Sequence, residues 1–417
     1  TAVPASATGE LNGVSASGWT NITGANATAV NGDHAITDSN GAAANVYINA
    51  PQAPWGPGSA ATDTLLKAIH ASYLDLGASN QWTVKVASDY LVSDVTLYMA
   101  GDGSEFAPVN VNGTNYVGGT NTTGEAAWGN RGTASSDVSD DTNTITVTGI
   151  TGGLIESSNK VINQATRGTI GGFQVVDTTA QHLYTTALGD ETVSAADATW
   201  TKGGETASLA DIGATARYMG TTGTGTIRFD EGTTLTALQA DGGTATVTGS
   251  NLTIGTLFAK SGSTLDMAGT LAAGSTVATG GMGTVKFSAN QTLGTLNQGG
   301  DITIASGKTL TAATWNRNYG TMTAEAGAAL NMTGDYGVWV AKGMIEAFSG
   351  EGTLHFTAKQ TGWQPNGNAI TLDVANKKVA FDAGLVLNGC GYAHQKITIR
   401  SGGDVTVSGD KFEVRRM

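Results

Sequence analysis

The sequence predicts an all-β protein built as a right-handed parallel β-helix, or β-solenoid, with irregular loops and one short N-terminal helix. Three observations lead there. A thirteen-residue pattern occurs five times in the second half, apolar residues alternate at period two within it, and 60 of 417 residues are glycine, the usual turn residue. Repeats of this size are units that bury their apolar faces only by stacking. The alternative is an antiparallel β-sandwich of short hairpins.

Each copy of the pattern reads Gly, usually Thr, apolar, any residue, apolar, then Gly or Asn three positions later and Leu after three more. The copies begin at Gly225, Gly255, Gly283, Gly300 and Gly320. Alternation places one set of side chains on one face of a strand. The pairs predicted to point inward are Ile227 and Phe229, Leu257 and Ala259, Val285 and Phe287, Ile302 and Ile304, and Met322 and Ala324.

A tight turn and a second strand complete each copy. The turn position holds Gly232, Gly262, Asn290, Gly307 and Gly327, and the inward leucines that follow are Leu235, Leu265, Leu293, Leu310 and Leu330. Glycine and asparagine adopt positive φ most readily, so a left-handed turn is predicted at all five positions. The starts are 30, 28, 17 and 20 residues apart, which predicts turns of the solenoid of roughly 17–30 residues with loops of variable length.

The first half is predicted to be an irregular β-rich region, 1–220, followed by the solenoid at 221–417. Strands are expected at 44–48, 82–86, 95–99, 144–147, 172–176 and 214–218. One helix is expected at 63–76, where Leu66, Ile69, Tyr73 and Leu76 share a face and Gly77 follows. Such a helix is suited to capping the end of a solenoid or packing on a sheet edge.

Composition indicates which partners the protein can bind and in which compartment it is found. The net charge is −13 and the pI about 4.7, which argues against nucleic acid because phosphate binding needs clustered Lys and Arg. No run of eighteen apolar residues occurs, so no membrane-spanning helix is expected. The chain starts TAVPASATG and is poor in cysteine; we expect a mature, exported chain after signal-peptide removal. Cys390, the single cysteine, is interpreted as a buried free thiol, with an intermolecular disulfide as the alternative.

The sequence shows no catalytic, cofactor-binding or metal site. The five histidines lie far apart at His34, His70, His182, His355 and His394, without metal-ligand spacing. An acidic group is a candidate calcium site, but its spacing does not match the EF-hand loop, and a solvated acidic loop is favoured. Its members are Asp137, Asp140, Asp141 and Asn143.

The outward positions of the repeat bear on carbohydrate chemistry. A β-helical polysaccharide lyase or hydrolase needs carboxylates beside Lys or Arg on neighbouring turns. The third position after each first glycine holds Arg228, Phe258, Lys286, Thr303 and Thr323, which predicts no carboxylate column. Threonine columns are predicted instead, as β-sheet filling rather than an ice-binding array. Their members are Thr234, Thr264, Thr292 and Thr309, and Thr226, Thr256, Thr284 and Thr321.

Three tryptophans, Trp315, Trp339 and Trp363, fall in breaks of the repeat. They are candidates for contact with sugars or a partner chain, and equally for capping the core.

The Gly-Thr-apolar-x-apolar repeats, over about 225–414 with their weaker copies, resemble those of autotransporter passengers and related bacterial surface β-solenoid proteins. The resemblance implies a secreted, non-enzymatic structural protein of the cell surface that self-assembles into a fibre or coat, or acts as an adhesin. Its expected partners are other copies of itself or surface glycans, with no cofactor. The alternative is a carbohydrate-active β-helix of the polysaccharide lyase, hydrolase or phage tailspike type.

Overall fold

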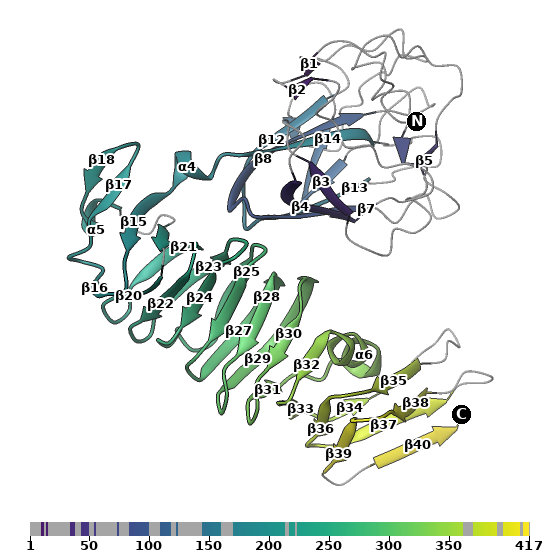
Figure 1. Ribbon diagram of the computed structural model, residues 1–417. Helices are drawn as coiled ribbons and strands as arrows, with labels where there is room; N and C mark the ends of the chain where they lie inside the picture. The colour runs from purple at the N-terminus through teal and green to yellow at the C-terminus, as the bar shows by residue number, and fades with distance from the viewer. Residues whose placement is uncertain are drawn as a thin grey trace. The chain divides into compact units, whose positions relative to one another are not determined.

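The computed structural model divides the chain into two compact units, Thr1–Thr179 and Ala180–Met417 (Figure 1). It describes residues 83–99, 109–117, 144–159, 170–212, 217–221, 223–361, 370–389, 395–408 and 412–416, with short strands at 10–11, 14–15, 34–37, 43–49, 54–55, 73–74 and 122–123. The boundary expected near residue 220 falls inside the second unit, because parallel strand pairing already begins at residue 184.

The first unit is built from antiparallel sheets. Its seven-stranded sheet runs in the order β11 (Thr122–Thr123), β10 (Thr114–Val117), β9 (Val109–Val111), β13 (Leu154–Asn159), β7 (Thr83–Ser88), β4 (Ala43–Asn49) and β3 (His34–Thr37). A second sheet places β8 (Val92–Met99) between β12 (Thr144–Thr151) and β14 (Ile170–Asp177). Alternation along β8 buries Val95 and Leu97. The strands expected at 44–48, 83–86, 95–99, 144–147 and 172–176 are confirmed, and of the strand expected at 214–218 only residues 217–218 are described, in β19 (Arg217–Thr221) of the second unit.

The predicted helix at 63–76 is wrong where the structure describes it. Tyr73–Leu74 forms β6, antiparallel to β5 (Pro54–Trp55); the rest of the range lies outside the described residues. Pairing with a strand some twenty residues earlier in the chain outweighs the local helical periodicity there. One further two-stranded pair, β1 (Glu10–Leu11) with β2 (Val14–Ser15), completes the described strands of this unit.

The second unit is a parallel β-solenoid, as the repeat predicts. Its longer sheet contains, in order, β18 (Glu205–Ala207), β17 (Trp200–Lys202), β15 (Tyr184–Leu188), β19 (Arg217–Thr221), β21 (Thr234–Asp241), β23 (Thr253–Ala259), β25 (Ser275–Gly280), β27 (Gln291–Gly299), β29 (Thr309–Tyr319), β31 (Ala329–Met332), β33 (Thr353–Phe356), β36 (Lys378–Phe381) and β39 (Asp404–Val407). From β15 to β39, omitting the β17–β18 hairpin, every pair in this sheet is parallel.

The second sheet of the solenoid has eight strands, β16 (Thr192–Ser194), β20 (Thr224–Arg228), β22 (Thr244–Thr248), β24 (Thr264–Met267), β26 (Thr284–Phe287), β28 (Asp301–Ile304), β30 (Met322–Ala324) and β32 (Phe348–Gly350). The chain passes from one sheet to the other on every turn, so strands succeed one another along the stack in sequence order (Figure 1). This arrangement is the solenoid predicted from stacking.

The length of a turn falls within the predicted range of roughly 17–30 residues, but the phase of one copy differs from the prediction. Thr224, Thr244, Thr264 and Thr284 are register partners twenty residues apart, so the copy starting at Gly255 lies half a turn out of phase. Its first strand is part of β23 in the thirteen-stranded sheet, whereas the first strands of the other four copies lie in the eight-stranded sheet. Both halves of a turn carry the same alternation and a glycine corner, and the pattern therefore fits either half.

The solenoid interior consists of stacked columns of apolar side chains. All ten residues of the predicted inward pairs and all five leucines are at most 2% exposed. In the eight-stranded sheet one column is Gly225, Ala245, Leu265, Val285, Ile302, Met322 and Phe348, and the next is Ile227, Val247, Met267, Phe287, Ile304, Ala324 and Gly350. Gly225, which begins the first column, lies beside Ile227 of the second column, and Gly350, which ends the second column, lies beside Phe348 of the first. We infer that each turn encloses a limited volume, which close packing must fill.

The turn glycines behave as predicted and the asparagine does not. Gly232, Gly262, Gly307 and Gly327 have φ between 68° and 76°. Asn290 is absent from the described residues with positive φ. Its side-chain Oδ1 instead accepts a hydrogen bond from the Thr309 backbone N–H at 2.9 Å. The side-chain acceptor of asparagine, rather than its tolerance of left-handed backbone, explains its presence at this position.

The two ends of the solenoid are built differently. At the N-terminal end the β17–β18 hairpin buries Trp200, whose indole N–H donates to Ala195 O at 2.9 Å, and the short helices α4 (Thr179–His182) and α5 (Leu209–Ile212) lie nearby in sequence. At the C-terminal end two small sheets join the stack. They are β34 (Gln360–Thr361), β37 (Leu385–Gly389) and β40 (Phe412–Arg416), and β35 (Ile370–Val374) with β38 (Gln395–Ile399).

Helix α6 (Gly337–Ala347) is inserted between β31 and β32. Its buried face includes Val338, Ala341 and Ile345. Lys377 Nζ donates to Ile345 O at 2.7 Å, which satisfies a carbonyl in the last turn of the helix. Burial, the largest cause, lowers the pKa of Lys377, and Glu346 and Asp373 oppose that shift.

Candidate functional site on the outer face of the eight-stranded sheet

Two columns of polar side chains cover the outer face of the eight-stranded sheet. The first contains Thr224, Thr244, Thr264, Thr284 and Asp301, and the second Thr226, Thr246, Asp266, Lys286, Thr303, Thr323 and Ser349. All are exposed or half-buried. Neighbours within a column lie about 4.8 Å apart, the ordinary spacing of strands.

The predicted threonine columns are therefore right in kind and wrong in membership. Thr264 and Thr284, predicted in different columns, share one, and Thr234 pairs with Thr253 in the other sheet. Thr256 is only 9% exposed. The errors follow from the half-turn displacement of the Gly255 copy, which assigned residues of both sheets to one face.

The same correction brings a carboxylate onto this face. Phe258, taken as an outward residue, is fully buried in the thirteen-stranded sheet. The position beside Lys286 belongs to Asp266, its register partner on the preceding turn. Asp266 Oδ1 is buried and has no hydrogen-bond partner among the residues that the structure describes. Single carboxylates therefore occur on this face, Asp266 in one column and Asp301 in the other, but they do not form a column.

Lys286 is held by the following turns rather than by Asp266. Its Nζ lies 3.2 Å from Glu325 Oε1, and Glu325 Oε2 accepts a hydrogen bond from Ser306 N at 2.8 Å. The bond from Ser306 and then the contact with Lys286 lower the pKa of Glu325, against a smaller effect of burial. In the described part of the chain no group of three or more His, Cys, Asp or Glu side chains could hold a metal ion.

Several polar side chains of the solenoid bond to the next turn. Asn316 Nδ2 donates to Asn297 Oδ1 at 2.9 Å, nineteen residues away. The Thr321 hydroxyl donates to Asp301 Oδ1 at 3.0 Å, twenty residues away. These separations equal one turn of the solenoid, so the bonds join successive turns.

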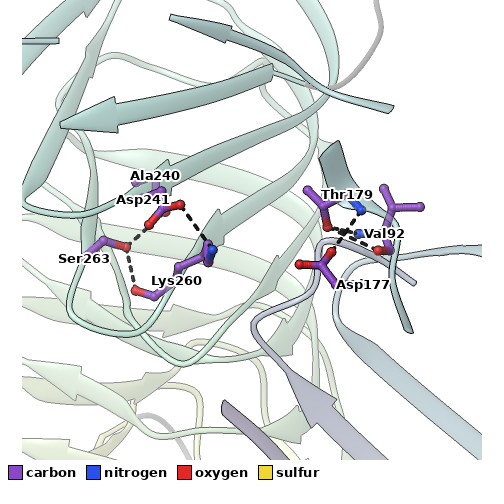
Figure 2. A network of polar contacts seen from close by, with 7 residues as sticks. All are labelled: Val92, Asp177, Thr179, Ala240, Asp241, Lys260 and Ser263. Carbon is purple, nitrogen blue, oxygen red and sulfur yellow. Dashed lines mark hydrogen bonds and ion pairs between the residues drawn. The ribbon is translucent and has the colours of Figure 1, made fainter. Parts of the chain in front are cut away.

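A corner of the stack shows the same arrangement (Figure 2). Lys260 Nζ forms an ion pair with Asp241 Oδ2 at 3.1 Å. Ser263 Oγ lies 2.6 Å from Lys260 O and 3.1 Å from Ala240 O, so one hydroxyl connects two turns. In the first unit, also in Figure 2, Thr179 Oγ1 accepts from Val92 N at 3.0 Å and lies 3.2 Å from Val92 O.

Buried glutamines form further connections of this kind. Gln298, fully buried, donates from Nε2 to Thr321 O at 2.8 Å and Gly300 O at 3.0 Å, and its Oε1 accepts from Trp315 Nε1 at 2.8 Å. Gln291 accepts from Leu271 N and donates to Gly269 O. A glutamine carries both a donor and an acceptor, so one side chain satisfies backbone groups on two turns. The bonds of these two glutamines between turns were not predicted from the sequence. The feature that could have indicated them is a long polar side chain within or next to an otherwise apolar strand pattern.

Trp315 is only 4% exposed. With its indole bonded to Gln298, it is part of the core, and its candidacy for sugar contact is wrong. The side chain of Trp339, on α6, lies outside the described residues, as do Trp363, Cys390, His70, His394 and the acidic group at 137–143. His355 Nδ1 lies 3.1 Å from Asp382 Oδ2 on the neighbouring turn. His182 is exposed on α4.

No protein-family model, curated protein or solved structure matches the chain. Among the described helices none is long and apolar enough to cross a membrane.

Proposed function

We propose that the chain is a secreted, non-enzymatic structural protein of a bacterial cell surface, whose solenoid self-assembles into an extracellular fibre or coat. The observation that supports this most is the direction of the polar contacts. Many side-chain hydrogen bonds of the solenoid join residues about nineteen to twenty-three positions apart, one turn from the next. Polar groups arranged in this way stabilise a stack along its axis, and stacking is the geometry of a scaffold.

Composition supports an exported, self-associating protein. Charged residues make up only 13% of the chain, and the net charge is −13. Few charges leave broad surfaces of Thr, Asn and Gly, and a modest negative charge disfavours nucleic acid. A single cysteine leaves stability to sheet stacking rather than disulfides. Partners of this kind of surface are other copies of the chain, or surface glycans if it serves as an adhesin.

Sedimentation velocity of the full chain over a wide concentration range tests the proposal. We expect reversible polymers whose size grows with concentration, because an open head-to-tail contact has no closed end state. A single monomeric species at every concentration, in salts and at pH values that preserve the fold, would contradict self-assembly.

A second candidate is carbohydrate cleavage or binding on the outer face of the eight-stranded sheet. It is favoured by one observation, the placement of Asp266 beside Lys286 on neighbouring turns. A carboxylate and an ammonium group there could serve acid–base chemistry on a polysaccharide, with threonine hydroxyls at the flanks. A glycan depolymerisation screen with the wild type and Asp266→Asn tests it. Activity lost in Asp266→Asn supports this candidate, and no activity, or activity equal in both proteins, removes it.

A further inference from the structure

The thirteen-stranded sheet ends in two edge strands, β18 and β39. Each pairs with one neighbour among the described strands, β18 with β17 and β39 with β36. An edge strand presents unpaired backbone groups that can pair with another chain. The two edges belong to one compact unit, so their directions and the facing of their residues can be compared.

The two edge strands run in the same direction. β15 is parallel to β19, and the parallel pairing continues to β39. β17 reverses the direction against β15, and β18 reverses it again against β17. The hairpin therefore restores the original direction, and β18 placed on the free side of β39 would continue a parallel sheet.

On β39 the backbone groups that face outward are those of the two valines. Asp404 N donates to Lys377 O at 3.0 Å and Ser408 N to Phe381 O at 2.9 Å. Because successive residues of a parallel strand direct their groups to opposite sides, the N–H groups of Val405 and Val407 point to the free side. Both valine side chains pack against the core yet are half-exposed.

On β18 the outward groups are those of Thr206. Gly203 and Gly204 form the two-residue turn, with φ of 60° and 89°, and Lys202 is opposite Glu205. The residues that flank such a turn bond to each other, so the next pair, Thr201 and Thr206, directs its groups away from its partner. Thr206 thus has a free donor and a free acceptor toward the edge.

Among the registers that these constraints allow, the one centred on β39 places Thr206 opposite Thr406. With Thr206 opposite Thr406, Thr206 N–H meets Val405 O, and Val407 N–H meets Thr206 O, as in any parallel ladder. The side-chain faces also agree. Ala207 and Val407 both pack against the core, while Thr206 and Thr406 are exposed.

The charges of the two ends favour pairing of β18 with β39 over pairing of two β18 strands or two β39 strands. Residues 180–212, which include the hairpin, contain five Asp or Glu and one Lys. Residues 395–417, which include β39, contain five Lys or Arg and three Asp or Glu, in a chain that is acidic overall. Two acidic ends repel each other and so do two basic ends, whereas an acidic end attracts a basic one.

We propose that β18 of one copy pairs in parallel with β39 of a second copy, and that this head-to-tail contact is the joint of the polymer. The inference rests on the proposed structural function and specifies its interface. The copy at each end of a polymer then keeps one free edge, to which a further copy can bind, so the polymer grows without closing.

Proline substitutions test the joint by removing single outward donors. Thr206→Pro and Val407→Pro each delete one N–H that the ladder within a copy does not use. Thr206→Ala and Val407→Ala are the matched controls, since they keep the N–H. Sedimentation velocity of the four full-length variants is expected to show monomers for each proline variant and wild-type polymers for each control.

Mixing the two proline variants is the decisive step. The Val407→Pro chain keeps an intact β18 and the Thr206→Pro chain an intact β39, so an equimolar mixture is expected to form dimers and nothing larger. Polymers in either proline variant, or a mixture that stays monomeric, would overturn the joint. If either result is found while the wild type polymerises, the joint alone is overturned and the proposed structural function stands. A monomeric wild type would overturn both the joint and the structural function.

Salt gives a test that does not depend on the folding of the variants. Attraction between oppositely charged ends is screened by added salt. The polymer fraction of the wild type is expected to fall as sodium chloride is raised from 20 mM to about 500 mM, well past the Debye screening of physiological salt. A polymer fraction that rises or stays constant over this range would exclude the charge-selected contact. Circular dichroism melting curves show whether each variant keeps the wild-type fold.

Discussion

Replacing Gln298 with leucine tests whether buried side chains hold successive turns together. Gln298 is fully buried and makes three hydrogen bonds. Leucine is apolar and one atom shorter, and it bonds to none of these partners. Thr321 O retains the bond from Ile302 N, so the substitution leaves two groups without partners, Trp315 Nε1 and Gly300 O. At about 1–3 kcal/mol for each buried orphan group, the expected loss of unfolding free energy is about 2–6 kcal/mol.

A double-mutant cycle assigns part of this cost to one bond. Trp315→Phe removes the indole donor, so Gln298→Leu should cost about 1–3 kcal/mol less in the phenylalanine background. The assay is urea unfolding followed by circular dichroism, with free energies from linear extrapolation. A Gln298→Leu cost below about 0.5 kcal/mol, within the range of a surface substitution, or an equal cost in both backgrounds, would refute the reasoning.

Two further predictions concern a turn and a carboxylate. Gly262 and Gly281 both have positive φ, but a Cβ at Gly262 meets nothing within 4 Å, whereas one at Gly281 would lie 2.0 Å from Ala259 O. By urea unfolding, Gly262→Ala is therefore expected to lower the unfolding free energy by about 1–2 kcal/mol and Gly281→Ala by about 3–5 kcal/mol. Equal losses for the two variants would contradict this prediction. The lowered pKa of Glu325 means that its stabilisation is present above the unfolded pKa of about 4.5 and is lost as pH falls through the folded value. Glu325→Gln should therefore melt below wild type at pH 7 and converge with it in acid, by a small margin because the side chain is 39% exposed; a gap that widens in acid would have the wrong sign.

The class of fold could be predicted because stacking imposes a pattern that alternation reveals. Ile227, Leu265 and Phe287 all carry it, and all are buried. The phase of the turns could not be predicted. Both halves of a turn satisfy the same pattern, and only strand pairing shows that Thr264 follows Thr244 in one column.

The polar side chains were predicted less well, because their partners lie a turn away. Gln298 and Asn290 look like ordinary surface residues until the register brings a backbone group of the next turn within reach. The role of Trp315 was left open between sugar contact and the core for the same reason: it falls where the repeat breaks, yet β29, eleven residues long, continues through that break. Local patterns identify which face is apolar, while contacts twenty residues apart depend on the length of each turn.

Electron microscopy of negatively stained protein taken from its native source tests the central claim most directly. The account predicts regular fibres or sheets, in which the solenoid axis continues from copy to copy and diffraction shows the strand spacing of about 4.8 Å along that axis. Single particles alone, at the concentration found on the cell, would contradict a self-assembling structural role.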